Sequence, residues 1–299
     1  MTRVNIAQTQ EDYPVNELPP FPLGDLDSLF IMPEFDESQL ASQMVDAYER
    51  SKTNPNAFSN WFHAVENAGV RHPKTQVLAI SPEIQAQILD NKPLATENQV
   101  EMDALVASVQ AFGEQHGFPI FWKTSFSSAK HFWNQACALP NGEPETVMNH
   151  LAELLTFQCM NGIETFTPEL ILREMIKVNP VFTAFEGQMP VTEEYRVFAR
   201  NGTIEGFQPY WPVESIKDPS SEGWESALAT ISTPTDRDID FMTKASERIT
   251  RALKGYWSVD FLKDKDGQLW LIDMAEGDRS YRNEAGFKVI KKPESGLSL

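Results

Sequence analysis

Cysteine is scarce in this sequence, and long apolar runs are missing. The 299 residues include two cysteines, Cys137 and Cys159, which make neither a disulfide framework nor a CxxC metal site. The five histidines are scattered along the chain, which argues against a histidine metal site. No stretch approaches the roughly 18 uncharged apolar residues of a membrane span, and the N-terminus shows no apolar export signal. We therefore expect a cytoplasmic protein with no membrane partner.

Basic residues are also in deficit. Lysine and arginine number 25 against 43 aspartates and glutamates, which gives a net charge of −18. High affinity for nucleic acid needs clustered basic side chains, so this balance argues against a nucleic-acid partner. The hydrophobic fraction of 41% excludes a wholly disordered chain. The signatures GxxxxGK[ST], GxGxxG, HExxH and GxSxG are absent.

The pattern of prolines and apolar residues divides the chain into four parts. Residues 1–26 are polar and broken by prolines, which favours an extended arm. Residues 27–115 show helical spacing around the β-branched run Thr75–Ile80, as expected for a small N-terminal α/β region. Residues 116–290 hold most of the strand-like runs, and we expect residues 291–299 to be a tail.

Helices are predicted in the N-terminal region over 40–48 and 58–65, from apolar residues at three- and four-residue intervals, and two more follow them. Ser81 followed by Pro82 is typical of a helix N-cap and first turn. Another helix, ending near Gly113 or Gly117, is predicted from four apolar residues that share one face: Val100, Leu105, Val109 and Phe112.

The predicted order of elements in residues 116–290 is β-α-β-β-β-α-β-β. One hairpin turns at Asn201-Gly202, the dipeptide favoured in two-residue loops, and another turns at KDKDG with Gly267. Antiparallel hairpins combined with helices predict an α+β fold. The predicted elements are 118–124, 144–160, 170–176, 194–200, 203–210, 239–253, 256–262 and 268–274.

Two aspartates lie in strand-like apolar runs joined by the second hairpin. Asp260 is the single acid of WSVDF, and Asp273 is the single acid of WLIDM. Neighbouring antiparallel strands bring the two carboxylates together, which is costly unless a cation lies between them. Mg²⁺ takes one or two carboxylates together with substrate phosphates. The pattern fits a magnesium site, and it equally fits two acids that face solvent.

Four basic residues lie on or beside predicted strands. Lys123 ends FPIFWK, Lys130 follows TSFSSA, Arg173 lies in LILREMI and Arg196 lies in EEYRVFAR. A phosphate site needs such fixed cations together with a metal. The loop Thr124–Ala129 has short side chains, so its backbone N–H groups can approach a phosphate. The alternative for each cation is a surface charge at a strand edge.

The chain resembles an ATP-grasp domain in four ordered motifs: FPIFWKTSFSSAKHFW, LILREMI, EEYRVFARNGTIEGFQPYW and YWSVDFLKDKDGQLWLIDM. Within that superfamily it is most similar to the branch of cell-division-cycle-123-type proteins and their bacterial and phage relatives. The resemblance covers residues 56–290. It implies two α+β subdomains that clasp a nucleotide, preceded by the smaller N-terminal region, and it implies ATP and Mg²⁺ as cofactors.

The resemblance also implies a role for each motif. Lys123 and Lys130 resemble two nucleotide-binding lysines, and the loop between them resembles a flexible lid over the phosphates. The segment from Arg173 onward resembles the one that reads adenine and ribose. Arg196 resembles an arginine that contacts the transferring phosphate, so Arg196 and Lys130 are the implied catalytic residues. The implied nucleotide-binding residues are Lys123, Ser125, Ser127, Ser128, Lys130, Arg173, Glu174, Met175, Ile176 and Arg196.

The metal ligands are carried over in the same way. Asp260 and Asp273 match the Mg²⁺ ligands of the family. Many members have asparagine two residues after the second acid, where this chain has Ala275. Glu276 follows directly and is the expected third ligand, and Asp278 offers a further carboxylate close by.

The resemblance implies an ADP-forming ligase that joins a carboxylate to an amine or thiol through an acyl phosphate. Its acceptor is a small molecule, a peptide or a protein. Two other functions stay open: an ATP-binding assembly chaperone without ligase chemistry, and a phospho- or nucleotidyltransferase with the same clamp. Arg279 and Arg282 could hold an acceptor carboxylate, or they are solvated loop residues. The oligomeric state is left open by the sequence.

Overall fold

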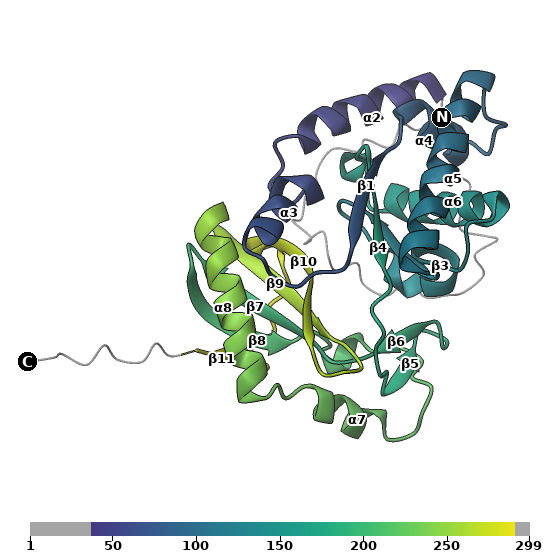
Figure 1. Ribbon diagram of the computed structural model, residues 1–299. Coiled ribbons are helices and arrows are strands. Elements are labelled where there is room, and N and C mark those ends of the chain that lie inside the picture. Colours follow the sequence, from purple (N-terminus) through teal and green to yellow (C-terminus); the bar gives the residue numbers. More distant parts are fainter. Residues whose placement is uncertain (1–36, 291–299) are drawn as a thin grey trace, which may run out of the picture.

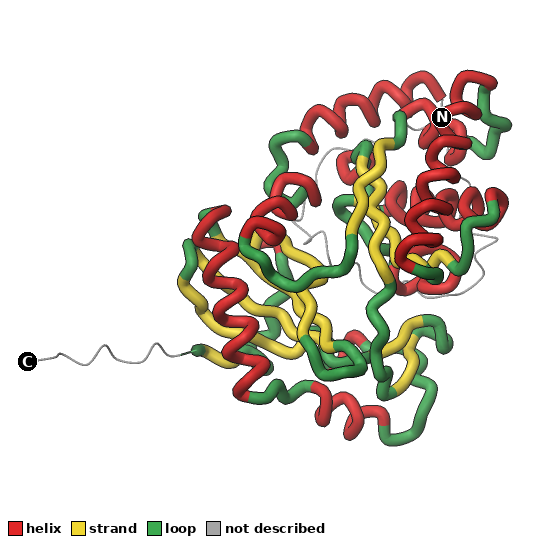
Figure 2. The backbone as a smooth tube through the Cα atoms, viewed as in Figure 1, coloured by secondary structure: helices red, strands yellow, loops and turns green. Residues whose placement is uncertain are grey.

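The computed structural model describes residues 37–290, so the predicted arm and tail lie outside the described residues. Two antiparallel sheets occupy separate halves of the molecule, each with its own helices (Figures 1 and 2). The predicted α+β architecture is therefore confirmed. Within the described range no helix is both long and apolar enough to cross a membrane.

The first sheet has the strand order β1-β4-β2-β3 and packs against helices from both sides of residue 115. Its core contains the fully buried Met44, Ile84, Trp122 and Leu151. The elements of this half are α2 (Glu37–Ser51), β1 (Thr75–Ala79), α4 (Pro82–Leu89), α5 (Thr96–His116), β2 (Ile120–Thr124), β3 (Ala138–Leu139), α6 (Pro144–Met160) and β4 (Glu169–Glu174).

The second sheet has the order β10-β9-β7-β8-β11, and α8 and α3 cover one of its faces (Figure 1). Tyr195, Val197, Val259 and Phe261 point to that covered face. The elements are α3 (Phe58–Asn67), β7 (Glu194–Arg200), β8 (Thr203–Pro209), α8 (Asp236–Leu253), β9 (Tyr256–Lys263), β10 (Leu269–Glu276) and β11 (Lys288–Val289).

A smaller cluster joins the two halves around the hairpin β5–β6 and the helix α7. Its buried residues include Phe182, Met189, Trp211 and Ile231. None of these elements was predicted from the sequence, because β5 and β6 have three residues each and α7 lacks the side-chain N-cap that marks α4. The remaining elements are η1 (Lys130–Phe132), the π-helix η2 (Trp133–Cys137), η3 (Ile163–Thr165), β5 (Phe182–Ala184), β6 (Met189–Val191), η4 (Val213–Ser215), α7 (Trp224–Ile231) and η5 (Gly277–Arg279).

Local sequence signals explain several element boundaries. The Ser81 side chain accepts a hydrogen bond from the Ile84 N–H, which caps α4 with Pro82 in its first turn. Asn201 and Gly202 both have positive φ angles, of 52° and 76°, as a tight hairpin turn requires. These predicted features are present in the structure.

Two local expectations need correction. Val100 is 70% exposed, so it is not part of the buried face of α5, which Met102 occupies instead. The strand predicted over 170–176 is β4, which ends at Glu174 and leaves Met175 and Ile176 in the connection that follows. The apolar run continues past the strand because the connection lines a cavity rather than the surface.

The boundary expected between residues 115 and 116 does not separate two independently packed regions. β1 pairs with β4 in one sheet, in the register Thr75↔Arg173. α2, α4 and α5 share one core with α6, while α3 packs on the second sheet. Each half of the molecule therefore draws on chain from both sides of the expected boundary.

Candidate functional site

A cavity of about 460 Å³ lies between the two halves and receives residues from both sheets. That volume is within the usual range for small-molecule sites. Twelve of the thirteen residues predicted for the site line this cavity, and the thirteenth, Glu276, does not. The twelve are Lys123, Ser125, Ser127, Ser128, Lys130, Arg173, Glu174, Met175, Ile176, Arg196, Asp260 and Asp273.

Strand alternation explains why the second sheet presents charge to the cavity. Side chains of a strand point alternately to opposite faces. Arg196 and Asp260 therefore face the cavity, while their neighbours Val197 and Val259 lie under α8. The polar face is the one that α8 leaves uncovered, so the amphipathic pattern of β7 and β9 determines where the site lies.

Asp260 and Asp273 are direct cross-strand partners, as the hairpin pattern predicted. A register irregularity between Leu271 and Asp273 brings the second acid into this position. Two adjacent carboxylates repel one another, and the sequence analysis assigned their compensation to a metal. In the structure each carboxylate also has a protein cation as its partner.

Arg196 holds Asp260 in a bidentate ion pair. Its Nε donates to Oδ1 at 2.8 Å and its Nη2 to Oδ2 at 3.0 Å. Both side chains are buried, with 8% and 7% of their surfaces exposed. Burial by itself lowers the pKa of Arg196, but the Asp260 carboxylate outweighs it and the net change is upward. The guanidinium stays charged and fixed at the cavity wall.

The first sheet contributes two buried cations on neighbouring strands. Lys123 Nζ on β2 donates to Asp273 Oδ2 at 2.8 Å, which links the two sheets. Arg173 on β4 donates from Nη1 to the carbonyl oxygen of Ile272. Its Nε and Nη2 are buried without a hydrogen-bond partner among the described residues. Burial lowers the pKa of Arg173 to about 10, and Asp273 opposes that change.

Two buried guanidinium nitrogens without a partner are costly, and the oxygens of an anion would satisfy both. Phosphate oxygens match the donor geometry of Arg173. The sequence patterns did not predict this feature, because the burial of Arg173 depends on two strands that flank β4.

Lys130 reaches the second half through aromatic residues. Its Nζ donates a hydrogen bond to the Tyr210 hydroxyl and lies 3.9 Å from the centre of the Tyr210 ring. Burial lowers the pKa of Lys130, but Tyr210, Glu194 and other groups outweigh it and the net change is upward. Lys130 is therefore a cation in the cavity.

Glu194 lines the cavity and was missed by the sequence analysis. Burial raises its pKa to about 7, Asp260 adds to the rise, and Lys130 and Arg196 oppose it. The signal was available in the sequence, because Glu194 lies two residues before Arg196 and a strand places such residues on one face.

The predicted lid loop is anchored at its start. The Ser125 hydroxyl donates to the Glu169 carboxylate and accepts a hydrogen bond from the Phe58 N–H at 3.0 Å. The Thr124 N–H donates to the Ser127 carbonyl oxygen at 2.9 Å. The side chain of Ser125 is therefore committed to the protein, and the rest of the loop lines the cavity up to Ala129.

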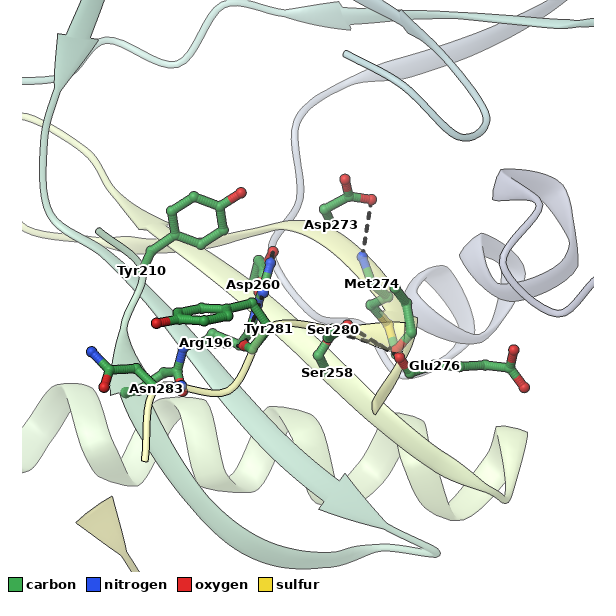
Figure 3. A network of polar contacts seen from close by, with 12 residues as sticks. Arg196, Tyr210, Ser258, Asp260, Asp273, Met274, Glu276, Ser280, Tyr281 and Asn283 are labelled. Atoms are coloured by element: carbon green, nitrogen blue, oxygen red, sulfur yellow. Dashed lines mark hydrogen bonds and ion pairs between the residues drawn. The ribbon is translucent and has the colours of Figure 1, made fainter. Parts of the chain in front are cut away.

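Glu276 points away from the two aspartates (Figure 3). Its carboxylate accepts a hydrogen bond from the Asn56 amide at 2.9 Å, and its N–H donates to Asn56 Oδ1 at 2.6 Å. Glu276 lies three positions after Asp273, an odd interval that sends the two side chains to opposite faces of β10. In residues 37–290 no group of three His, Cys, Asp or Glu side chains is arranged to hold a metal.

The residues at the cavity nevertheless fit Mg²⁺ in its nucleotide-bound form. This ion is usually held by one or two carboxylates and by substrate phosphates, without a full protein cage. Asp273 is suited to that role because 41% of its side-chain surface is exposed. Asp260 lies beside it in register. The apolar side chains of Phe121, Met175 and Ile176 line the same cavity and suit an adenine ring.

The arginines that follow β10 differ from one another. Arg282 contacts Glu205, Glu284 and Tyr256, and its guanidinium carbon lies 3.8 Å from the centre of the Phe287 ring. These contacts commit Arg282 to the protein. Arg279 lines the cavity.

Comparison of the sequence with protein families shows which family this chain belongs to. The model for the ATP-grasp domain, R-2-K clade family 3, matches residues 111–290. This chain belongs to that family of ATP-grasp domains. The resemblance inferred from the four sequence motifs is confirmed, and so is the ATP-grasp fold. The family match leaves residues 37–110 outside it, although α3 and β1 belong to the two halves of the fold.

Solved structures similar to the chain are distant in sequence. Cdc123 from Schizosaccharomyces pombe is 14% identical with a TM-score of 0.47, and the match covers 79% of this chain and 85% of that chain. D-alanine–D-alanine ligase from Bacillus anthracis, complexed with ATP, is 14% identical with a TM-score of 0.36, over 75% of this chain and 54% of that one.

The ATP-grasp ligase PsnB, complexed with a precursor peptide and AMPPNP, is 11% identical with a TM-score of 0.38. That match covers 76% of this chain and 50% of PsnB. The chain thus spans about half the length of both ligases. No curated protein matches the sequence.

Proposed function

We propose that this protein is an ATP- and Mg²⁺-dependent, ADP-forming ligase that joins a carboxylate to an amine or thiol. The observation that supports it best is the gathering of Lys123, Lys130, Arg173 and Arg196 around one cavity in a chain of net charge −18. Cations concentrated against the overall charge suit a ligand as anionic as a triphosphate.

The two halves would share the nucleotide. Phe121, Met175 and Ile176 would contact the base, and the backbone of the 124–129 loop would approach the phosphates. Arg173, which has unsatisfied donors, would bind phosphate oxygens. Asp260 and Asp273 would hold Mg²⁺, which when bound withdraws electron density from the phosphate oxygens.

The reaction would proceed in two displacements. A substrate carboxylate oxygen forms a bond to the γ-phosphorus while the bond to the ADP oxygen breaks. The amine or thiol then forms a bond to the carbonyl carbon, and phosphate leaves with the bonding electron pair and takes up the proton that the nucleophile loses. Arg196 and Lys130 would neutralise charge on the transferring phosphoryl oxygens, an effect strongest in the transition state.

Product analysis tests the reaction type. The protein is incubated with MgATP and a pool of amino acids, dipeptides and small carboxylic acids. The expected nucleotide product is ADP, released with phosphate and dependent on an acceptor. AMP with pyrophosphate would assign nucleotidyl transfer instead. Tight binding of MgATP without turnover for any acceptor would favour the assembly chaperone.

A pair of variants tests whether the activity takes place in this cavity. Arg196→Ala should abolish turnover, whereas Arg200→Ala, four residues along the same strand but paired with Glu205 outside the cavity, should not. Equal activity in the two variants would contradict the assignment of this cavity as the active site.

A further inference from the structure

Tyr210 lies between a cation from each half of the molecule. It follows β8 and lines the cavity. Lys130, from the first half, lies 3.9 Å from the ring centre and donates to the hydroxyl. Arg196, from the second sheet, has its guanidinium carbon 4.9 Å from the same ring centre. One ring is thus in contact with both proposed catalytic cations.

The Tyr210 ring is itself fixed by its surroundings. Its backbone N–H donates to the Glu194 carbonyl oxygen at 2.9 Å. The Trp211 ring packs edge-on against it, with 4.9 Å between the ring centres. Trp211 is buried in the cluster around β5 and β6 and lies 4.6 Å from Lys130 Nζ. The ammonium group of Lys130 therefore contacts two adjacent aromatic rings.

The contacts with Tyr210 and Trp211 restrict the position of the Lys130 ammonium group. Lysine has a flexible four-carbon stem, so its ammonium group needs a partner to hold one position. Arg196 is already fixed by Asp260, whereas the side-chain hydrogen bond that holds Lys130 is the one to Tyr210. An aromatic face attracts both cations, and the hydroxyl adds an acceptor for one of them.

We propose that Tyr210 is a positioning residue of the nucleotide site, which holds Lys130 opposite Arg196 so that both can meet the same phosphate group. This inference rests on the proposed function. It adds a residue that neither the sequence motifs nor the family match assigns. Tyr210 acts through Lys130 and needs no contact with the substrate.

The test is a double-mutant cycle between Tyr210 and Lys130, read as the affinity for Mg-AMPPNP by calorimetry. Tyr210→Leu removes the ring and the hydroxyl, and we expect about tenfold weaker binding, from the size of a desolvated cation–π contact. Tyr210→Phe keeps the ring and should lose about threefold or less. In the Lys130→Ala background, Tyr210→Leu should have little further effect.

Tyr256 provides a matched control. The Arg200 guanidinium carbon lies 4.0 Å from its ring centre, but neither residue lines the cavity. Tyr256→Leu should leave the affinity unchanged. Where Tyr210→Leu fails to fold, Tyr210→Phe takes its place in the cycle, because it removes only the hydroxyl bond to Lys130.

The outcomes separate this inference from the proposed function. If the wild type binds Mg-AMPPNP but the losses of affinity from Tyr210→Leu and Lys130→Ala simply add in the double variant, the positioning role is wrong. The assignment of the nucleotide site would be unaffected. Unchanged affinity in Tyr210→Leu would do the same. Absence of any Mg-AMPPNP binding by the wild type would contradict the proposed function, and the positioning role with it.

Discussion

Lys123 Nζ and Asp273 Oδ2 form an ion pair at 2.8 Å that joins β2 of the first sheet to β10 of the second. The lysine is buried, while 41% of the aspartate side chain is exposed. A proposed phosphate-binding cation and a proposed metal ligand thus neutralise one another across the cavity. Mg²⁺ and nucleotide phosphates would have to replace both partners, so each ligand should help the other to bind.

Asp273→Asn should therefore make nucleotide binding independent of Mg²⁺. Without the carboxylate, Lys123 is free to bind phosphate. AMPPNP should therefore bind more tightly in the presence of EDTA, by about three- to tenfold, which is the size expected for the loss of a partly exposed ion pair. Added Mg²⁺ should no longer improve the affinity. Calorimetry with and without Mg²⁺ measures both effects, and Asp240→Asn, which removes an exposed helical ion pair, is the control. A Mg²⁺ effect as large as in the wild type would exclude Asp273 as a ligand.

Asp260→Asn should destabilise the protein. From the sequence, neutralising one of two neighbouring acids relieves repulsion, but the structure places Asp260 in a buried bidentate pair with Arg196. Removing its charge leaves a buried guanidinium without a charged partner, which costs about 3 kcal/mol of unfolding free energy. Urea denaturation measures the change, and Asp273→Asn should cost less, because Asp273 makes one hydrogen bond to Lys123 instead of two and 41% of its side chain is exposed to solvent. Equal losses in the two variants would contradict the difference in burial.

Arg196→Lys should affect rate more than binding. A lysine keeps the positive charge but cannot form the two parallel hydrogen bonds to Asp260. The charge that Arg196 is proposed to neutralise develops in the transition state, so kcat should fall about a hundredfold or more while the KM for MgATP changes little. Steady-state kinetics in the ADP-release assay measures both constants. A rise in KM at constant kcat would assign Arg196 to ground-state binding.

Glu194 should make stability fall as pH rises. Burial raises the pKa of Glu194 to about 7, whereas the carboxyl of the unfolded chain has a pKa of 4.5. Between these values the folded state holds a proton that the unfolded state has lost, so folding becomes less favourable with increasing pH, by an amount on the order of 3 kcal/mol.

Glu194→Gln removes this titration. Relative to the wild type, the variant should gain thermal stability between pH 5 and pH 8, and Glu114→Gln, on the exposed side of α5, should not. Parallel melting curves of wild type and Glu194→Gln across this range would show that Glu194 ionises normally.

The loop between Lys123 and Lys130 should become more ordered when nucleotide binds. Ser125 is tied to Phe58 and Glu169, so the change should be confined to residues 126–130. Backbone N–H groups that gain phosphate partners exchange more slowly. Hydrogen exchange with and without MgATP measures this, with the hairpin turn at Gly267 as an internal control. Unchanged exchange at 126–130 under conditions of demonstrated binding rules out a phosphate lid.

The sequence by itself determined the local structure that supports the site. Ser81 and Pro82 begin α4, the Asn201-Gly202 turn joins β7 to β8, and α6 has the predicted bounds Pro144–Met160. These features depend on backbone preferences and on contacts between residues close in the chain. The alternation within β7 and β9 also put Arg196 and Asp260 on polar strand faces.

The tertiary structure decided which residues meet. Lys123 and Asp273 are 150 positions apart, and nothing in either strand predicts their ion pair. The same holds for Tyr210 between Lys130 and Arg196, and for the burial that shifts the pKa of Glu194. Alternation fixes the face of a strand that a side chain occupies, but the packing of two sheets determines what lies opposite that face. The chemistry at this cavity arises from that packing, because Lys123, Arg173 and Lys130 of the first half are held by Asp273, Ile272 and Tyr210 of the second.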